Sequence, residues 1–149
     1  MNTIRVGFTG TQEGLTKGQH AKLSETLRAL HAEGEGISHF HHGDCIGADS
    51  EAHGIVRALF SRVFIVGHIP EKNDKRGFNE CDEERIPLPY LTRNRCIVDE
   101  VDVMIACPKE REETVRSGTW STVRYAREIG RRLIIVFPQE PFVAYSDAR

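Results

Sequence analysis

Three glycine-containing junctions carry the residues best suited to chemistry, and each follows an apolar run of the chain. They occupy residues 7–11, 43–49 and 116–119. Glycine lets the backbone approach an anion closely, and the N-terminus of a following helix supplies free N–H groups and a partial positive charge. The junctions therefore predict phosphate binding, and three of them on one small chain predict a single nucleotide-sized pocket.

The elements that must position these junctions alternate along the chain. Short apolar runs predict strands over residues 4–9, 38–42, 62–67, 102–107 and 133–138. Helical periodicity predicts helices from an N-cap at Thr16 to about residue 34, and over residues 48–60, 92–100 and 119–129. This alternation predicts a Rossmann-like, doubly wound α/β fold with a mostly parallel, five-stranded sheet and flanking helices. Parallel strands place all three junctions along one edge of that sheet.

One irregular stretch, residues 68–91, interrupts this rhythm. It contains prolines and many charged side chains. Because loops of this length are uncommon inside a compact domain, the stretch is either a lid or binding loop, or a solvated surface excursion.

Length and composition limit the class of protein. The 149 residues fit a single domain, and a net charge of -2 argues against a surface that coats nucleic acid in general. The four cysteines form no CxxC pair and follow no secretory signal, which favours reduced thiols and a cytoplasmic location. No apolar run approaches the roughly 20 residues that cross a bilayer, so no membrane partner is expected.

Two common nucleotide motifs are absent. The first junction does not fit GxGxxG, because the glycine after Gly10 falls at Gly14, and GxxxxGK[ST] occurs nowhere. The sequence therefore disfavours a conventional dinucleotide fold and a P-loop nucleoside triphosphatase.

A family resemblance extends over almost the whole chain. Residues 43–53, Gly-Asp-Cys-Ile-Gly-Ala-Asp-Ser-Glu-Ala-His, resemble the glycine-rich pattern of the DNA-processing protein Smf. Arg93-Asn94-Arg95 resembles the start of that family's third helix, and residues 116–131 resemble its fourth-helix motif. The LONELY GUY phosphoribohydrolases share this framework within the SLOG superfamily. The resemblance implies one SLOG-like nucleotide-binding domain over residues 1–149 that forms a homodimer.

The resemblance also implies a set of ligand-binding residues. The phosphate is expected on Gly118, Thr119 and Arg93, because an arginine at a helix start is unfavourable unless an anion lies there. The full expected set is Gly10, Thr11, Gly43, Asp44, Gly47, Asp49, Arg93, Asn94, Ser117, Gly118 and Thr119. No cofactor is expected.

Catalysis is a separate question. In LONELY GUY enzymes a carboxylate of the fourth-helix motif and an arginine of the third helix cleave an N-glycosidic bond. Arg93 matches the arginine, but Thr122 stands at the carboxylate position, and a hydroxyl cannot replace a carboxylate near neutral pH. A substitute carboxylate could come from Asp44, Asp49 or Glu51, and we expect Arg93, Asp44 and Glu51 as the catalytic set.

The function predicted from the sequence is binding of a nucleotide or nucleotide derivative, either as a sensor or as a nucleoside monophosphate phosphoribohydrolase-like enzyme. The alternative is a single-stranded DNA-binding module, with arginines for the backbone and Tyr90, Trp120 and Tyr125 to stack on bases.

Clustered histidines raise the question of a metal site. His39 and His41 are expected on one face of a strand and His42 on the other. No third ligand of suitable spacing follows, so the sequence predicts no metal site. His53 is expected to orient the second junction through a hydrogen bond.

Overall fold

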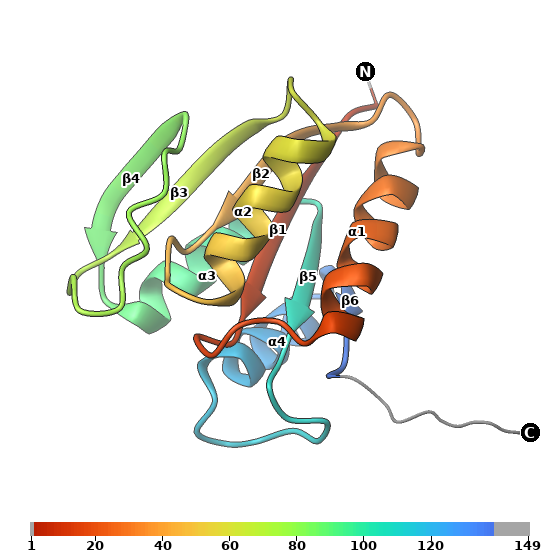
Figure 1. Cartoon of the computed structure of the whole chain (residues 1–149). Helices are drawn as coiled ribbons and strands as arrows, with labels where there is room; N and C mark the ends of the chain where they lie inside the picture. Colours follow the sequence, from red (N-terminus) through yellow and green to blue (C-terminus); the bar gives the residue numbers. More distant parts are fainter. Residues whose placement is uncertain (1, 139–149) are drawn as a thin grey trace, which may run out of the picture.

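A six-stranded, all-parallel sheet forms the centre of this computed structural model, which describes residues 2–138 (Figure 1). The strands are β1 (Ile4–Gly10), β2 (Ile37–His42), β3 (Phe64–Pro70), β4 (Glu83–Leu88), β5 (Val103–Cys107) and β6 (Arg132–Ile135), in the order β4-β3-β2-β1-β5-β6. The helices are α1 (Lys17–His31), α2 (Ala48–Leu59), α3 (Tyr90–Glu100) and α4 (Gly118–Glu128). The Rossmann-like α/β class is confirmed, whereas the prediction of five strands was wrong.

The strand order creates a crevice at one edge of the sheet. After β1 the chain adds β2, β3 and β4 on one side, and it then returns to place β5 on the other side of β1. Helices α1 and α2 cover one face, while α3 and α4 lie on the opposite face (Figure 1). Ligands of such sheets bind where the order reverses, outside the carboxyl ends of β1 and β5.

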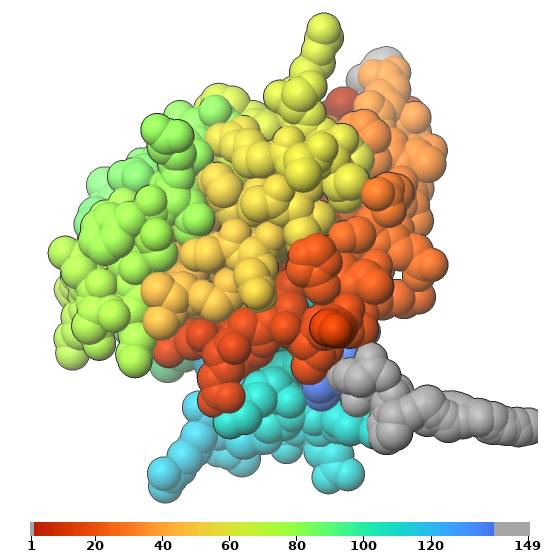
Figure 2. All heavy atoms as spheres, viewed as in Figure 1, coloured from red at the N-terminus to blue at the C-terminus, as the bar shows by residue number. Residues whose placement is uncertain are grey.

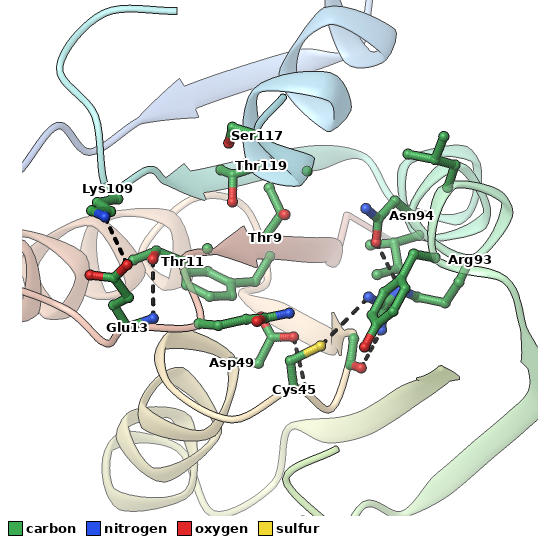
Figure 3. Close-up of a pocket in the computed structure, with 18 of the residues that line it drawn as sticks. Thr9, Thr11, Glu13, Cys45, Asp49, Arg93, Asn94, Lys109, Ser117 and Thr119 are labelled. Atoms are coloured by element: carbon green, nitrogen blue, oxygen red, sulfur yellow. Dashed lines mark hydrogen bonds and ion pairs between the residues drawn. The ribbon is translucent and has the colours of Figure 1, made fainter. Parts of the chain in front are cut away.

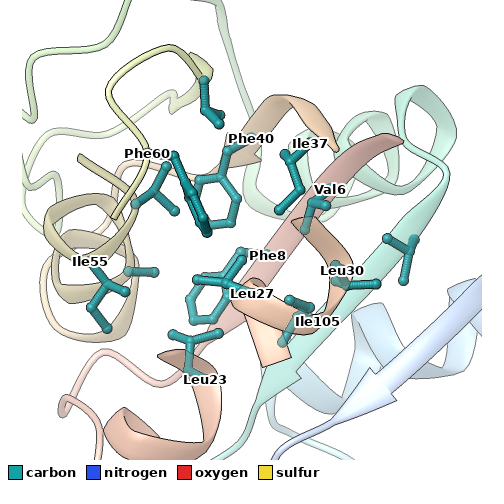
Figure 4. Packing of buried hydrophobic residues seen from close by; sticks show 14 of the residues in the cluster. Val6, Phe8, Leu23, Leu27, Leu30, Ile37, Phe40, Ile55, Phe60 and Ile105 are labelled. Carbon is teal, nitrogen blue, oxygen red and sulfur yellow. The ribbon is translucent and has the colours of Figure 1, made fainter. Parts of the chain in front are cut away.

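Helix α1 shows how sequence pattern produces this packing. Thr16 accepts a hydrogen bond from the Gln19 amide at 3.0 Å, and the Gln19 side chain accepts one from the Thr16 amide at 3.1 Å, which completes a capping box. The apolar residues that follow at helical spacing are buried against the aromatic rings of the sheet, in a cluster that includes Leu23, Leu27, Leu30, Phe8 and Phe40 (Figure 4).

The strand that the sequence did not predict is β4, and it lies inside the irregular stretch of residues 68–91. β4 pairs in parallel with β3, from Val66 opposite Glu83 to Pro70 opposite Leu88. Its charges and its proline at position 87 hide the pattern of a strand, but both are compatible with an exposed sheet edge. The Asp82 carboxylate accepts a hydrogen bond from the Ile65 amide at 2.7 Å and fixes the start of the pairing.

A membrane-spanning helix must be both long and strongly apolar, and the helices of the described residues can be judged by both properties. None of the four meets both conditions.

Candidate functional site

A cavity of about 470 Å³ opens at the carboxyl ends of β1 and β5, and all three glycine junctions contribute to its wall (Figure 3). Figure 2 shows the segment after β1, in red, against the segment after β5, in cyan, at the lower edge of the molecule. There the Lys109 ammonium lies 2.7 Å from the Glu13 carboxylate, and the Thr11 amide donates to the Cys107 carbonyl at 3.2 Å. The lining residues are Phe8, Thr9, Gly10, Thr11, Gln12, Glu13, Gly43, Cys45, Asp49, Tyr90, Leu91, Arg93, Asn94, Ile97, Lys109, Glu110, Arg116, Ser117, Gly118 and Thr119.

The third junction presents the start of α4 to this cavity. The Ser117 hydroxyl caps the helix by accepting from the Trp120 amide at 3.1 Å. Among residues 2–138, the amides of Gly118 and Thr119 make no hydrogen bond, as expected for the first positions of a helix. A Cβ atom added at Gly118 would meet nothing within 4 Å. This junction therefore offers free donors, a helix dipole and open space to an anion.

The glycines of the other junctions are required by packing. A Cβ atom at Gly10 would lie 2.6 Å from the Ala48 side chain, and one at Gly43 would collide with the Arg93 guanidinium. Gly47 has a positive φ of 83° and abuts the backbone of Gln12, and it does not line the cavity. Gly118 thus differs from these three glycines in that nothing in the fold itself demands it.

Arg93 is buried at the cavity wall and uses much of its guanidinium on protein atoms. Nη1 donates to the carbonyls of Gly43 and His68, the latter at 3.0 Å, and Nε donates to Asn94 Oδ1 at 2.8 Å. Nη2 has only a weak contact of 3.7 Å with Cys45 Sγ. Arg93 therefore holds the ends of β2 and β3 in place and leaves one donor group for a ligand.

Asp49 is the acidic counterpart of Arg93 at this wall. Its side chain is buried, and Oδ2 accepts a hydrogen bond from the Cys45 amide at 3.1 Å. Oδ1 has no hydrogen-bond partner among the described residues. Burial raises the pKa of Asp49 to about 6, although the positive charge of Arg93 opposes this shift. The carboxyl group therefore has a pKa close to neutral pH, and one of its oxygens is buried without a hydrogen-bond partner among the described residues.

The structure places the other two expected carboxylates outside the cavity lining. Asp44 is fully buried and accepts hydrogen bonds at 2.8 Å from the Arg76 guanidinium and from both the amide and the side chain of Asn79. Glu51 accepts from the Leu15 amide at 2.6 Å. Both groups are thus engaged in loop contacts, while the Thr122 hydroxyl donates to the Gly118 carbonyl at 2.9 Å within its own helix.

Of the three aromatic side chains proposed for stacking on bases, only Tyr90 lies at the cavity. Tyr90 lines the cavity beneath the Arg93 guanidinium, which lies 5.3 Å from the centre of its ring, and its hydroxyl has no partner among the described residues. Trp120 is buried in the core beside Phe137, and Tyr125 donates to Asp99 at 2.7 Å. Neither Trp120 nor Tyr125 lines the cavity.

Polar residues that sequence reasoning missed complete the wall. Gln12 and Glu13 follow the first junction, and Lys109 and Glu110 follow β5. Their positions directly after buried strands were the available signal, because the carboxyl ends of parallel strands meet at one edge.

Two buried histidines, His42 and His53, support the second junction through hydrogen bonds. His42 Nδ1 accepts a hydrogen bond from the Asp44 amide at 2.9 Å, and His42 Nε2 lies 3.0 Å from His53 Nδ1. His53 therefore acts on the glycine loop through the ring of His42 rather than by direct contact.

Comparisons with known proteins bear on the fold. No protein-family model and no curated protein matches the sequence. The structure is similar to the molybdenum cofactor binding protein from the phototrophic bacterium Rippkaea orientalis, with a TM-score of 0.68 and 19% identity over 93% of this chain and 79% of that chain. It is also similar to the structural genomics target TM1055, with a TM-score of 0.62 and 17% identity over 88% of this chain and 72% of that chain. At such identities the similarity shows the α/β fold alone.

Proposed function

We propose that this chain is a SLOG-like domain that binds a nucleotide or nucleotide derivative at the carboxyl edge of its sheet. The observation that carries the proposal is the convergence of three glycine junctions on one cavity, where the free amides of α4 face the buried Asp49–Arg93 wall. A volume of about 470 Å³ falls within the range of small-molecule sites.

Each part of a nucleotide has a matching part of the cavity. A phosphate fits the free amides of Gly118 and Thr119 and the hydroxyls of Ser117 and Thr119. Asn94 suits ribose hydroxyls or polar base edges. The ring of Tyr90 offers a stacking surface for the base.

The charges of the cavity favour a small ligand over a DNA strand. Three basic side chains, Arg93, Lys109 and Arg116, line it together with three acidic ones, Asp49, Glu13 and Glu110. A single-strand groove needs a continuous excess of positive charge along the backbone. If the chain instead binds single-stranded DNA tightly, with an affinity that falls steeply as salt increases, the alternative function replaces this one.

Hydrolysis of an N-glycosidic bond is a second candidate, and Asp49 is the observation that favours it. This carboxyl group lies at the cavity wall with an oxygen that is unpartnered among the described residues and a pKa of about 6, whereas Thr122 stands where the resembled LONELY GUY motif has its carboxylate. This activity is measured as release of the free base from a nucleoside monophosphate.

Thermal unfolding with a ligand panel tests the binding proposal. The panel contains nucleoside monophosphates, cyclic nucleotides, ADP-ribose and, because one structural neighbour is named for binding it, molybdenum cofactor. A ligand at 100 times its Kd stabilises the fold by about 2.7 kcal/mol, which raises Tm by roughly 5–10 °C.

Two glycine variants make the test specific. Gly118→Val fills open space at the anion site, so we expect the wild-type Tm without ligand and at least about tenfold weaker binding of the ligand that stabilises the wild type. Gly54→Val is the matched control, because a Cβ atom at Gly54 on α2 also meets nothing within 4 Å and Gly54 lies outside the cavity. Equal binding by both variants, or no stabilisation of the wild type by any ligand, contradicts the proposal.

A further inference from the structure

Two histidines and a glutamate from three separate elements meet between the sheet and α3, on the face opposite α2. His41 comes from β2, His68 from β3 and Glu100 from the last residue of α3. Both imidazole rings are almost fully buried, and the Glu100 side chain is 35% exposed. The sequence offered no third ligand because Glu100 lies 32 or more positions away from either histidine and reaches them only through the fold.

The distances within this group suit a metal ion. His41 Nδ1 lies 2.8 Å from His68 Nε2, and Glu100 Oε1 lies 3.8 Å from the former nitrogen and 4.0 Å from the latter. A point in the plane of these three atoms lies about 2.1 Å from each of them, which is the distance at which zinc binds imidazole nitrogen and carboxylate oxygen.

The protons of the two rings can be arranged to free both donor atoms. Only one proton fits between His41 Nδ1 and His68 Nε2, and the second nitrogen of each ring makes no hydrogen bond within the described residues. If each neutral ring carries its proton on that second nitrogen, two lone pairs face the same point together with a carboxylate. A cation at that point takes the place of the shared proton.

A second cluster of possible metal ligands lies nearby, but one of its ring nitrogens has no lone pair free for a metal. His42, His53 and Cys81 also lie close together, on the other face of the sheet. His42 Nδ1 already accepts the Asp44 amide, so the proton of the neutral ring sits on Nε2 and points at His53. Because that nitrogen has no lone pair for a metal, the group is a hydrogen-bond relay.

We propose that His41, His68 and Glu100 form a binding site for a divalent transition metal of the zinc class, with a fourth position open toward solvent. Two imidazoles and one carboxylate form a donor set that suits zinc better than calcium or magnesium. The site is independent of the proposed nucleotide function, although it adjoins the cavity: the His68 carbonyl accepts a hydrogen bond from Arg93. A bound metal thus fixes the end of β3 against α3.

Arg85 competes with a metal for the Glu100 carboxylate. Its Nη2 lies 2.6 Å from Glu100 Oε1, the same oxygen that the metal would bind. Arg85 belongs to the edge strand β4, is about one-third exposed and also pairs with Glu83, so it can release Glu100 without disturbing the core. Removing this guanidinium should therefore strengthen metal binding, an effect that loss of a merely structural ion pair does not produce.

The experiment titrates the full-length, chelator-stripped chain with zinc against a chromogenic chelator, and with cobalt(II) followed by absorption. We expect one equivalent to bind, with affinity lowered about tenfold or more in Glu100→Gln and raised about tenfold in Arg85→Gln. Glu128→Gln, an exposed change on α4, is the matched control and should bind as the wild type does.

Three results overturn the site. The wild type binds no zinc, or Glu100→Gln and Arg85→Gln both retain the wild-type affinity, or cobalt produces the thiolate charge-transfer band that places the metal on Cys81. Because the two variants are expected to change affinity in opposite directions, a general loss of stability cannot imitate the expected result.

Discussion

Asp49 combines burial, a raised pKa and an unpartnered oxygen at a cavity wall that it shares with Arg93. Its ionised form is disfavoured by burial, so the protonated and ionised carboxyl groups are both accessible near neutral pH. A group of this kind can stabilise a developing positive charge or transfer a proton. At the scale of single residues, Asp49 is therefore the residue we propose for the role that Thr122 cannot fill, because the Thr122 hydroxyl is bonded to its own helix.

If the chain hydrolyses a nucleoside monophosphate, Asp49→Asn should lower the rate by about 10²- to 10⁴-fold. The stability should hold or increase, because the ionised carboxylate is the costly form in the buried site and asparagine still accepts from the Cys45 amide. The wild-type rate should fall as the pH drops below about 6, where Asp49 becomes protonated. Free base is measured by chromatography.

Glu51→Gln is the matched control for this prediction, because Glu51 is a carboxylate of the same helix that contacts the Leu15 amide instead of the cavity. Its rate should remain close to that of the wild type. A rate lost in Glu51→Gln and kept in Asp49→Asn would return the catalytic role to the carboxylate expected from the sequence.

At the scale of elements, the segment between β3 and β4 braces the second junction. The Gly77 amide donates to the Asp44 carbonyl at 2.7 Å, and the Ile46 amide donates to the Lys75 carbonyl at 2.9 Å. No residue of 71–82 lines the cavity, whereas Tyr90 and Leu91 at the start of α3 do. The segment of residues 71–82 therefore stabilises the second junction through backbone hydrogen bonds and does not form part of the cavity wall.

The sequence predicted the elements with strong periodicity and missed those that depend on distant partners. Helix α1 followed from its capping box and leucine spacing, whereas β4 pairs only because β3 and Asp82 present partners to a charged, proline-containing edge. The same holds for the site. Glycine junctions and strand ends predicted the edge, but the partners of Asp44 and the free oxygen of Asp49 arise from tertiary packing that no local pattern records.

The buried ion pair of this brace should be important for stability. Asp44→Ala leaves Arg76 Nε and the Asn79 amide without their buried acceptor, while Arg76 keeps its pair with Glu84, so we expect the free energy of unfolding to fall by about 3 kcal/mol. Urea unfolding measures this change. Glu25→Ala, which breaks the exposed pair with Lys22, is the control and should change stability by about 0.5 kcal/mol or less. Similar losses in both variants would show that the brace has no special role.

At the scale of the whole molecule, histidines are buried on both faces of β2. His41 packs toward His68 on the α3 side, and His42 packs toward His53 on the α2 side. The charged and titratable groups close enough to act on His42 are His53, Asp44, Arg93 and, from the other face of the strand, His41, with Cys81 Sγ 3.7 Å away. Burial, the largest cause, lowers the pKa of His42 to about 3. The native fold thus holds a neutral ring where the unfolded chain binds a proton.

The sign of the resulting pH dependence follows from this difference. A depressed pKa contributes stability above the unfolded value of about 6.5, and that stability is lost as the pH falls toward 3, at about 1.4 kcal/mol per pH unit for one proton. Asp49 acts in the opposite direction between about pH 6 and 4, because its folded-state pKa is raised. The wild-type stability should therefore decrease on acidification by the net effect of the buried histidines less that of Asp49.

His42→Asn isolates one of these contributions. Asparagine is not titratable and can still accept the Asp44 amide, so the slope of unfolding free energy against pH should fall by about 1.4 kcal/mol per pH unit between pH 6.5 and 4. His20→Asn, which removes an exposed ring of α1, should keep the wild-type slope. Urea unfolding at a series of pH values measures both. An unchanged slope in His42→Asn would mean that the buried ring is protonated in the native fold, and that the relay through His53 to the glycine loop carries a charge.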